Sequence, residues 1–131
     1  KFDIKAVIVM PESTPLTKIN GVKHFGAEVI LHGLNYDEAY SYATTYAIKN
    51  SLTFVHPFED EEVIAGQGTV ALEILDKAQD FDAIIIPIGG GGLIAGMSEA
   101  IKAINPKIEV IGVSAAGAPA FKESYEKREA I

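Results

Sequence analysis

Short runs of apolar residues alternate along the chain with longer stretches in which apolar residues recur at helical spacing. Five runs predict strands, at residues 6–10, 28–31, 52–56, 83–88 and 110–114. Each run is short and consists mainly of Val, Ile, Leu or Phe, a pattern typical of strands buried on both faces of a sheet.

Four of the intervening stretches predict helices, and their starts and ends carry recognisable signals. Pro15 is suited to a first helical turn, Asn35 with Glu38 forms a capping box of the Asn type, and Asn105-Pro106 ends the last helix. The apolar positions of the four helices are Leu16, Ile19 and Val22; Tyr36, Ala39, Tyr40, Ala43 and Ala47; Val70, Ile74, Leu75 and Ala78; and Leu93, Met97, Ala100, Ile101 and Ile104.

Strand and helix alternate, which predicts an α/β fold of three layers, with mostly parallel sheets and right-handed crossover helices. A boundary between two lobes is expected near residues 57–66, because His56-Pro57-Phe58 ends a strand and the acidic run Glu59-Asp60-Glu61-Glu62 is typical of a turn. We therefore predict a βαβαβ segment of a small lobe at residues 1–57. Residues 58–131 are predicted to form part of a large lobe.

The composition narrows the class of protein. With 131 residues, 48% of them hydrophobic, the chain can bury a core, and intrinsic disorder is excluded. The longest apolar run, residues 83–88, is far shorter than the roughly 20 residues that a membrane span requires. The net charge of −7 argues against duplex DNA as a partner, because phosphate contacts need clustered Lys and Arg.

The absence of cysteine excludes disulfides, a thiolate nucleophile and Cys-ligated zinc, and it favours a reducing compartment such as the cytoplasm. The chain begins at Lys1 without Met and ends in a charged stretch, residues 122–129. This predicts an internal fragment of a longer protein. The lack of a signal peptide is then uninformative.

Four consecutive glycines, Gly89, Gly90, Gly91 and Gly92, followed by Leu93, stand between an apolar strand and an amphipathic helix. Glycine lets the backbone turn sharply and present successive N–H groups with no Cβ in the way. A helix N-terminus favours an anion, and the carboxyl end of a parallel strand is where α/β sheets bind ligands. The pattern predicts a phosphate-binding loop. A turn without a ligand is the alternative, but one glycine would suffice for it.

Two common phosphate-binding motifs fit this loop poorly. Gly90, Gly92 and Ala95 match the dinucleotide pattern G-x-G-x-x-G/A, but the next strand ends in Val113-Ser114, without the acid that an NAD ribose requires. No Gly-Lys-Ser/Thr follows the glycines, which rules out a P-loop.

Several further motifs accompany the loop. They are Met10-Pro11 with Pro15-Leu16-Thr17-Lys18-Ile19-Asn20, Gly26-Ala27-Glu28-Val29, His56-Pro57-Phe58 and Ala65-Gly66-Gln67-Gly68-Thr69. In this order, and over essentially the whole chain, they resemble the threonine/serine dehydratases, fold type II enzymes that use pyridoxal phosphate (PLP). The tetraglycine form followed by Leu is similar to the dehydratase branch, whereas the related cysteine synthases usually carry Thr within the loop.

The resemblance implies that the backbone N–H groups of Gly89, Gly90, Gly91, Gly92 and Leu93 bind the PLP phosphate. It implies β-elimination of L-threonine, and of L-serine as a second substrate, to 2-oxobutanoate or pyruvate and ammonia, with PLP as the electron sink. It also implies an amino-acid substrate, a homo-oligomer, and a place in amino-acid metabolism such as isoleucine biosynthesis.

The chain departs from the family pattern in its catalytic groups. The family's Schiff-base lysine stands in a Ser-Phe-Lys-x-Arg-Gly-Ala context, which no lysine here shares. Phe121-Lys122 is the one Phe-Lys pair, and its setting in Ala-Phe-Lys-Glu-Ser predicts a solvated lysine. The Ser-Ala-Gly-Asn-His loop and the later Ser or Cys facing the pyridine nitrogen are also absent. We therefore assign no catalytic residue to this chain.

The remaining polar residues predict structure rather than chemistry. His24, His32 and His56 are widely spaced, and none has a second ligand at helical spacing. Serine-racemizing relatives place an acidic cation ligand at the end of the strand after the glycine loop, but that position is Ser114 here, so no metal site is predicted. The Gly66-Gln67-Gly68-Thr69 run is expected at a helix start that packs closely on a neighbour.

These observations predict a fragment of a PLP-dependent threonine dehydratase that carries the phosphate loop without the lysine. Two alternatives stay open. One is a non-catalytic α/β module that binds a phosphorylated ligand through the same loop, and the other is a cysteine-synthase-like PLP transferase. A Ser-Phe-Lys-x-Arg-Gly-Ala run preceding Lys1 would decide between the first alternative and an enzyme.

Overall fold

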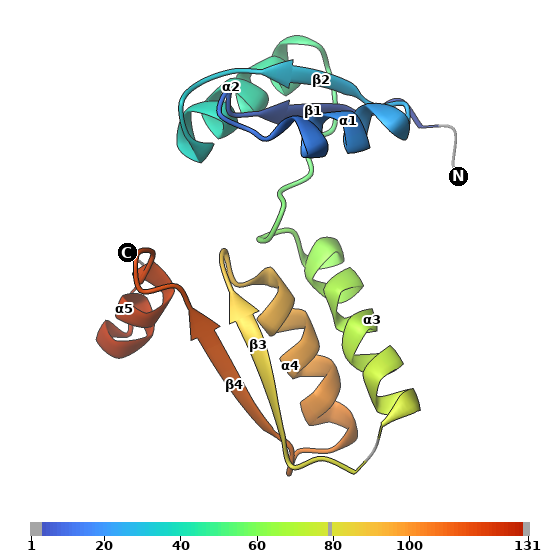
Figure 1. Cartoon of the computed structure of the whole chain (residues 1–131), viewed down its shortest axis with the longest axis vertical. Helices are drawn as coiled ribbons and strands as arrows, with labels where there is room; N and C mark the ends of the chain where they lie inside the picture. Colours follow the sequence, from blue (N-terminus) through green and yellow to red (C-terminus); the bar gives the residue numbers. More distant parts are fainter. Residues whose placement is uncertain (1–3, 79, 130–131) are drawn as a thin grey trace. The chain divides into compact units, whose positions relative to one another are not determined.

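The computed structural model describes residues 4–78 and 80–129, and strands and helices alternate along most of them (Figure 1). The chain divides into two compact units, Lys1–Phe54 and Val55–Ile131, each of which is considered by itself. The elements are β1 (Val7–Met10), α1 (Leu16–His24), β2 (Glu28–Leu31), α2 (Tyr36–Lys49), α3 (Glu61–Lys77), β3 (Ala83–Ile88), α4 (Gly92–Ile104), β4 (Glu109–Ser114) and α5 (Ala120–Lys127).

In the first unit, β1 and β2 pair in parallel, and α1 provides the crossover between them. The capping box predicted for α2 is present, because Asn35 Oδ1 accepts a hydrogen bond from the Glu38 N–H at 3.0 Å. The Glu38 carboxylate reaches back and accepts from the Leu34 N–H at 2.9 Å. The first bond satisfies an N–H group that the start of a helix otherwise leaves without a partner, and the second ties the residue before the cap to the helix.

In the second unit, β3 and β4 pair in parallel over their full length, and α4 connects them. A single apolar core lies between this sheet and the helices α3 and α4. It is formed by Ala71, Leu75, Ile86, Met97, Ile101 and Ile108. The parallel pairs and crossover helices in both units confirm the predicted α/β class.

The β3 and β4 strands bury mainly one face within the described residues. Ile86 is 1% exposed, whereas its neighbour Ile85 is 69% exposed and Val113, on β4, is 51% exposed. Alternating strand residues point to opposite faces, and the core with α3 and α4 lies on the Ile86 side. Within the described residues the helices cover one face of this sheet, and burial of the other face stays a prediction.

The strand predicted at residues 52–56 is also wrong, because this segment is extended but pairs with no other strand in the described part of the chain. A strand needs a neighbour for its N–H and C=O groups, and an apolar run does not supply one. Within the described residues the first unit therefore has the element order βαβα, while the assignment of residues 1–57 to a small lobe stays a prediction. The division between the units falls after Phe54, three residues before the predicted boundary at residue 57.

The acidic run is not a turn throughout, since α3 begins inside it. Asp60 caps the helix, with its Oδ1 accepting from the N–H of Glu62 at 2.9 Å and of Val63 at 3.4 Å. Glu61 and Glu62 then occupy the first turn, where the helix dipole favours negative charge. The Gly66–Thr69 run consequently lies within α3, not at its start as predicted.

One helix was not anticipated. α5 occupies most of the charged stretch near the end of the chain, and Phe121 and Tyr125 lie four residues apart on it. Among the described residues, no helix combines the length and apolarity needed to cross a membrane.

Candidate active site: the glycine loop

The glycine loop joins the carboxyl end of β3 to the start of α4, and its backbone conformation requires glycine at one position in particular. Gly91 has φ +93°, in the left-handed region that side chains disfavour. It directly precedes α4, and its carbonyl accepts the first helical hydrogen bond, from the Ala95 N–H at 3.0 Å. The loop thus turns the chain from strand to helix within three residues.

The first turn of α4 presents N–H groups that no side chain caps. Gly91 has no side chain to serve as a cap, and there is no acidic residue in the first turn. In α2 and α3, by contrast, Asn35 and Asp60 accept these hydrogen bonds and acidic residues follow. The N–H groups of the first helical turn cannot bond within the helix, so those of Gly92 and Leu93 are available to an anion.

Three of the four glycines are also required by packing or conformation. A Cβ on Gly90 would overlap the ring of Phe58, and one on Gly92 would lie 3.0 Å from the Phe58 Cα atom. A Cβ on Gly91 would lie 3.0 Å from Cε2 of Phe121. Gly89 differs, because its Cβ would meet nothing within 4 Å. One glycine therefore does not suffice for this turn even without a ligand, since close packing requires two more.

The loop borders a hollow of about 330 Å³ within the second unit. All five residues predicted to bind phosphate, Gly89, Gly90, Gly91, Gly92 and Leu93, line it. The structure therefore brings them around one cavity, while their binding of a phosphate stays a prediction. Four other residues complete the lining: Pro57, Phe58, Gln67 and Pro87.

Of these four, Phe58 and Gln67 have no assigned role in the sequence analysis, although both lie in motifs that carried the family resemblance. Phe58 comes from the segment before α3 and Gln67 from the middle of α3, 31 and 22 residues before Gly89. No spacing rule links such distant positions to the loop. The only available signal was their recurrence in the same set of motifs.

His56 organises the segment that carries Phe58. Its Nδ1 accepts hydrogen bonds from the N–H of Phe58 at 3.3 Å and of Glu59 at 3.0 Å. Its ring also packs edge-on against that of Phe58, with centroids 4.6 Å apart. This confirms a structural role for His56, as predicted.

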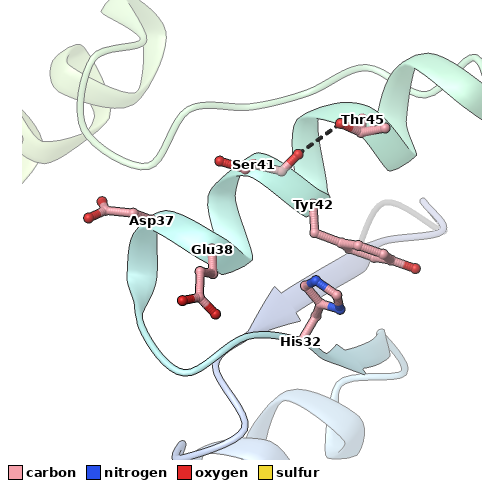
Figure 2. A pocket seen from close by; sticks show the side chains of 6 residues that line it. All are labelled: His32, Asp37, Glu38, Ser41, Tyr42 and Thr45. Atoms are coloured by element: carbon pink, nitrogen blue, oxygen red, sulfur yellow. Dashed lines mark hydrogen bonds between the residues drawn. The ribbon is translucent and has the colours of Figure 1, made fainter.

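A second hollow, of about 490 Å³, lies on α2 in the first unit (Figure 2). Four of its six lining side chains are engaged in local structure: the Thr45 hydroxyl donates to the Ser41 carbonyl at 2.9 Å, His32 stacks on Tyr42 at 4.1 Å, and the Glu38 carboxylate accepts from the Leu34 N–H at 2.9 Å. Within the described residues, no group of three or more His, Cys, Asp and Glu is placed to hold a metal ion. The glycine loop is therefore the candidate site.

Comparison with known proteins decides the family. The model of a family described as "Pyridoxal-phosphate dependent enzyme" matches residues 1–131. The chain belongs to this family. An L-threonine dehydratase, catabolic TdcB, from Staphylococcus aureus is 49% identical over 125 residues, which cover 95% of this chain and 36% of that protein. An L-threonine ammonia-lyase from Thermotoga maritima is 47% identical over 129 residues, which cover 98% of this chain and 32% of that protein.

Solved structures give the same result. The processed form of threonine deaminase isoform 2 from Solanum lycopersicum matches with a TM-score of 0.89 and 40% identity, over 98% of this chain and 38% of that one. Maize serine racemase matches with a TM-score of 0.89 and 34% identity, over 98% of this chain and 39% of the racemase chain. The chain thus spans about one third of the length of the curated relatives it matches.

The family's cofactor, pyridoxal phosphate, fits the residues present. A phosphate has only acceptor atoms at neutral pH, and the loop offers uncapped N–H donors beside a glycine whose missing Cβ leaves open space. In the part of the chain that the structure describes, no acidic side chain lines the hollow to repel it.

Proposed function

We propose that this PLP-family chain is part of an enzyme that deaminates L-threonine to 2-oxobutanoate and ammonia, with L-serine as a second substrate that yields pyruvate. Two observations together support the proposal. The glycine loop leaves the first turn of α4 uncapped, and the chain is closely similar to proteins named threonine dehydratase or ammonia-lyase. The Staphylococcus aureus relatives are named catabolic, which favours amino-acid degradation over the isoleucine biosynthesis implied by the resemblance.

The proposed task of these residues is to hold the cofactor by its phosphate. The N–H groups of Gly89 to Leu93 bind the phosphate, and the α4 dipole favours its negative charge. Phe58, Pro87 and Leu93 are apolar neighbours that keep water from part of the hollow. When bound, PLP supplies an electron sink for breaking bonds at the amino acid's α-carbon.

The other parts of the proposed active site, above all the lysine bonded to PLP, are assigned to the remainder of the protein. No lysine among residues 4–78 and 80–129 lines the hollow, and we propose that the lysine bonded to PLP lies outside these 131 residues. We assign residues 1–57 to the smaller lobe of the enzyme and residues 58–131 to the larger one. Homo-oligomeric assembly belongs to the same proposal, and light scattering on the full-length protein would measure it.

Steady-state assays of the full-length protein with PLP test the proposal. L-Threonine, L-serine and O-acetylserine with sulfide are compared as substrates. We expect 2-oxobutanoate from threonine at the highest kcat/KM. Turnover of O-acetylserine and sulfide alone would assign the protein to the cysteine-synthase branch, and formation of D-serine without ammonia would make it a racemase. PLP-independent binding of phosphorylated ligands without turnover would favour the non-catalytic module.

A further inference from the structure

The hollow beside the glycine loop contains one polar side chain. Its described lining consists of glycines, prolines, Phe58, Leu93 and Gln67, and among these residues Gln67 alone carries a side-chain group that can form hydrogen bonds. No Lys or Arg that the structure describes lines it. An anion here would be held by neutral donors, so each donor contributes a large share of the binding.

The Gln67 amide is available for this purpose. Gln67 is half-buried, and its side chain forms no hydrogen bond with any described residue. The nearby Thr69 hydroxyl, by contrast, already donates to the Gly66 carbonyl at 2.7 Å. Each Gln amide has two N–H donors, and a phosphate has acceptor atoms only.

The packing of α3 on α4 explains why Gln67 lies at the loop. Gly68 follows it directly, and a Cβ there would lie 2.9 Å from the Gly96 carbonyl oxygen. A Cβ on Gly96 would in turn overlap the Ile64 carbonyl. These two glycines bring the helices into backbone contact one turn beyond the start of α4. The residue beside Gly68 is thereby held next to the uncapped first turn.

We propose that Gln67 is a cofactor-binding residue, whose amide N–H donates to the phosphate of PLP together with the N–H groups of the glycine loop. This inference rests on the proposed function, because it assumes that the loop binds that phosphate. It assigns chemistry to the Gly66–Thr69 motif, which otherwise has only a packing role. Gln67 reaches the cofactor through its non-reacting end, so it affects retention of PLP more than the chemical step.

The test compares PLP with pyridoxal, which lacks the phosphate, on full-length apoenzyme. Gln67→Leu keeps a good helix former of similar size but removes the donor, and Gln67→Glu keeps the shape but adds a negative charge. We expect PLP binding, followed by fluorescence, to weaken about 10- to 100-fold in Gln67→Leu and further in Gln67→Glu. Pyridoxal binding should change less than twofold in Gln67→Leu. The ³¹P chemical shift of bound PLP should also move.

The matched control is Glu73→Gln, which replaces a carboxylate by an amide, the reverse of Gln67→Glu. Glu73 lies six residues further along α3 at an exposed position. This variant should leave PLP binding and the ³¹P shift unchanged. Circular dichroism of each apoenzyme checks folding, and inorganic phosphate as a competitor gives a second readout for a variant that binds no PLP. Equal losses for PLP and pyridoxal in Gln67→Leu would overturn the inference, as would no loss for either.

A loop variant separates this inference from the proposed function. If Gly91→Asp weakens PLP binding far more than Gly91→Asn does while Gln67→Leu binds normally, the loop holds the phosphate and Gln67 does not. If Gly91→Asp retains PLP as tightly as the wild type, the phosphate lies elsewhere, and the proposed site and the role of Gln67 are both wrong.

Discussion

Gly68 on α3 and Gly96 on α4 lie in backbone contact, and a Cβ on Gly68 would stand 2.9 Å from the Gly96 carbonyl oxygen. Side chains normally hold two packed helices 8–10 Å apart, and glycine permits a closer approach. This contact lies one helical turn from the glycine loop. The pair therefore sets the position of α3 relative to the candidate site.

Gly68→Ala should destabilise the apoenzyme, because a carbonyl oxygen of a neighbouring helix cannot move aside without shifting that helix. We expect a loss of about 1–3 kcal/mol in the free energy of unfolding, measured by urea denaturation. Gly66→Ala is the matched control two residues earlier, where a Cβ meets nothing within 4 Å. It should be neutral or stabilise by about 0.5–1 kcal/mol through helix propensity. Equal effects of the two changes would contradict the close contact.

Gly89→Ala and Gly90→Ala should show which glycine leaves room for the cofactor and which is required by packing against Phe58. Gly90→Ala forces a methyl into the Phe58 ring, so we expect the apoenzyme to lose about 1–3 kcal/mol of stability. Gly89→Ala meets no atom within 4 Å and should leave apoenzyme stability within about 0.5 kcal/mol. Its methyl would occupy part of the hollow, so PLP binding should weaken several-fold. Thermal melts with and without PLP measure both effects, and undiminished PLP stabilisation of Gly89→Ala would place the phosphate elsewhere.

Gly91→Asp and Gly91→Asn test the electrostatics of the loop with two side chains of nearly the same shape. Both residues tolerate the left-handed conformation better than other side chains, so the strain is similar in the two variants. Asp adds a negative charge beside a phosphate dianion, which should weaken PLP binding at least about tenfold more than Asn does. Equilibrium dialysis gives the two dissociation constants. Equal constants would mean that the phosphate does not bind here.

The 131-residue polypeptide by itself should form no specific adduct with PLP. Every lysine that the structure describes is exposed, and none lines the hollow. Borohydride reduction followed by peptide mapping should find low, scattered modification of several lysines and no deamination of threonine. A single stoichiometric adduct accompanied by deamination would show that a lysine of this chain serves the reaction. Wild-type full-length protein treated in parallel is the positive control.

Local signals account for what could be predicted from the sequence. The apolar runs at residues 28–31 and 83–88 are strands with those bounds, and Asn35 caps its helix as its spacing from Glu38 indicates. The position of the glycine loop between β3 and α4 follows in the same way. Apolar runs, caps and glycines act through the few residues around them, so their consequences can be worked out before the fold is known.

Contacts between segments far apart in the sequence determined the features that could not be predicted. Whether residues 52–56 form a strand depends on a neighbouring strand, which an apolar run cannot guarantee. Gly90 and Gly92 are required because Phe58, more than 30 residues earlier, packs against them, and Gln67 reaches the hollow because Gly68 and Gly96 bring two helices into contact. Sequence spacing carries no information about such approaches, since they are created only when the chain packs into its tertiary structure.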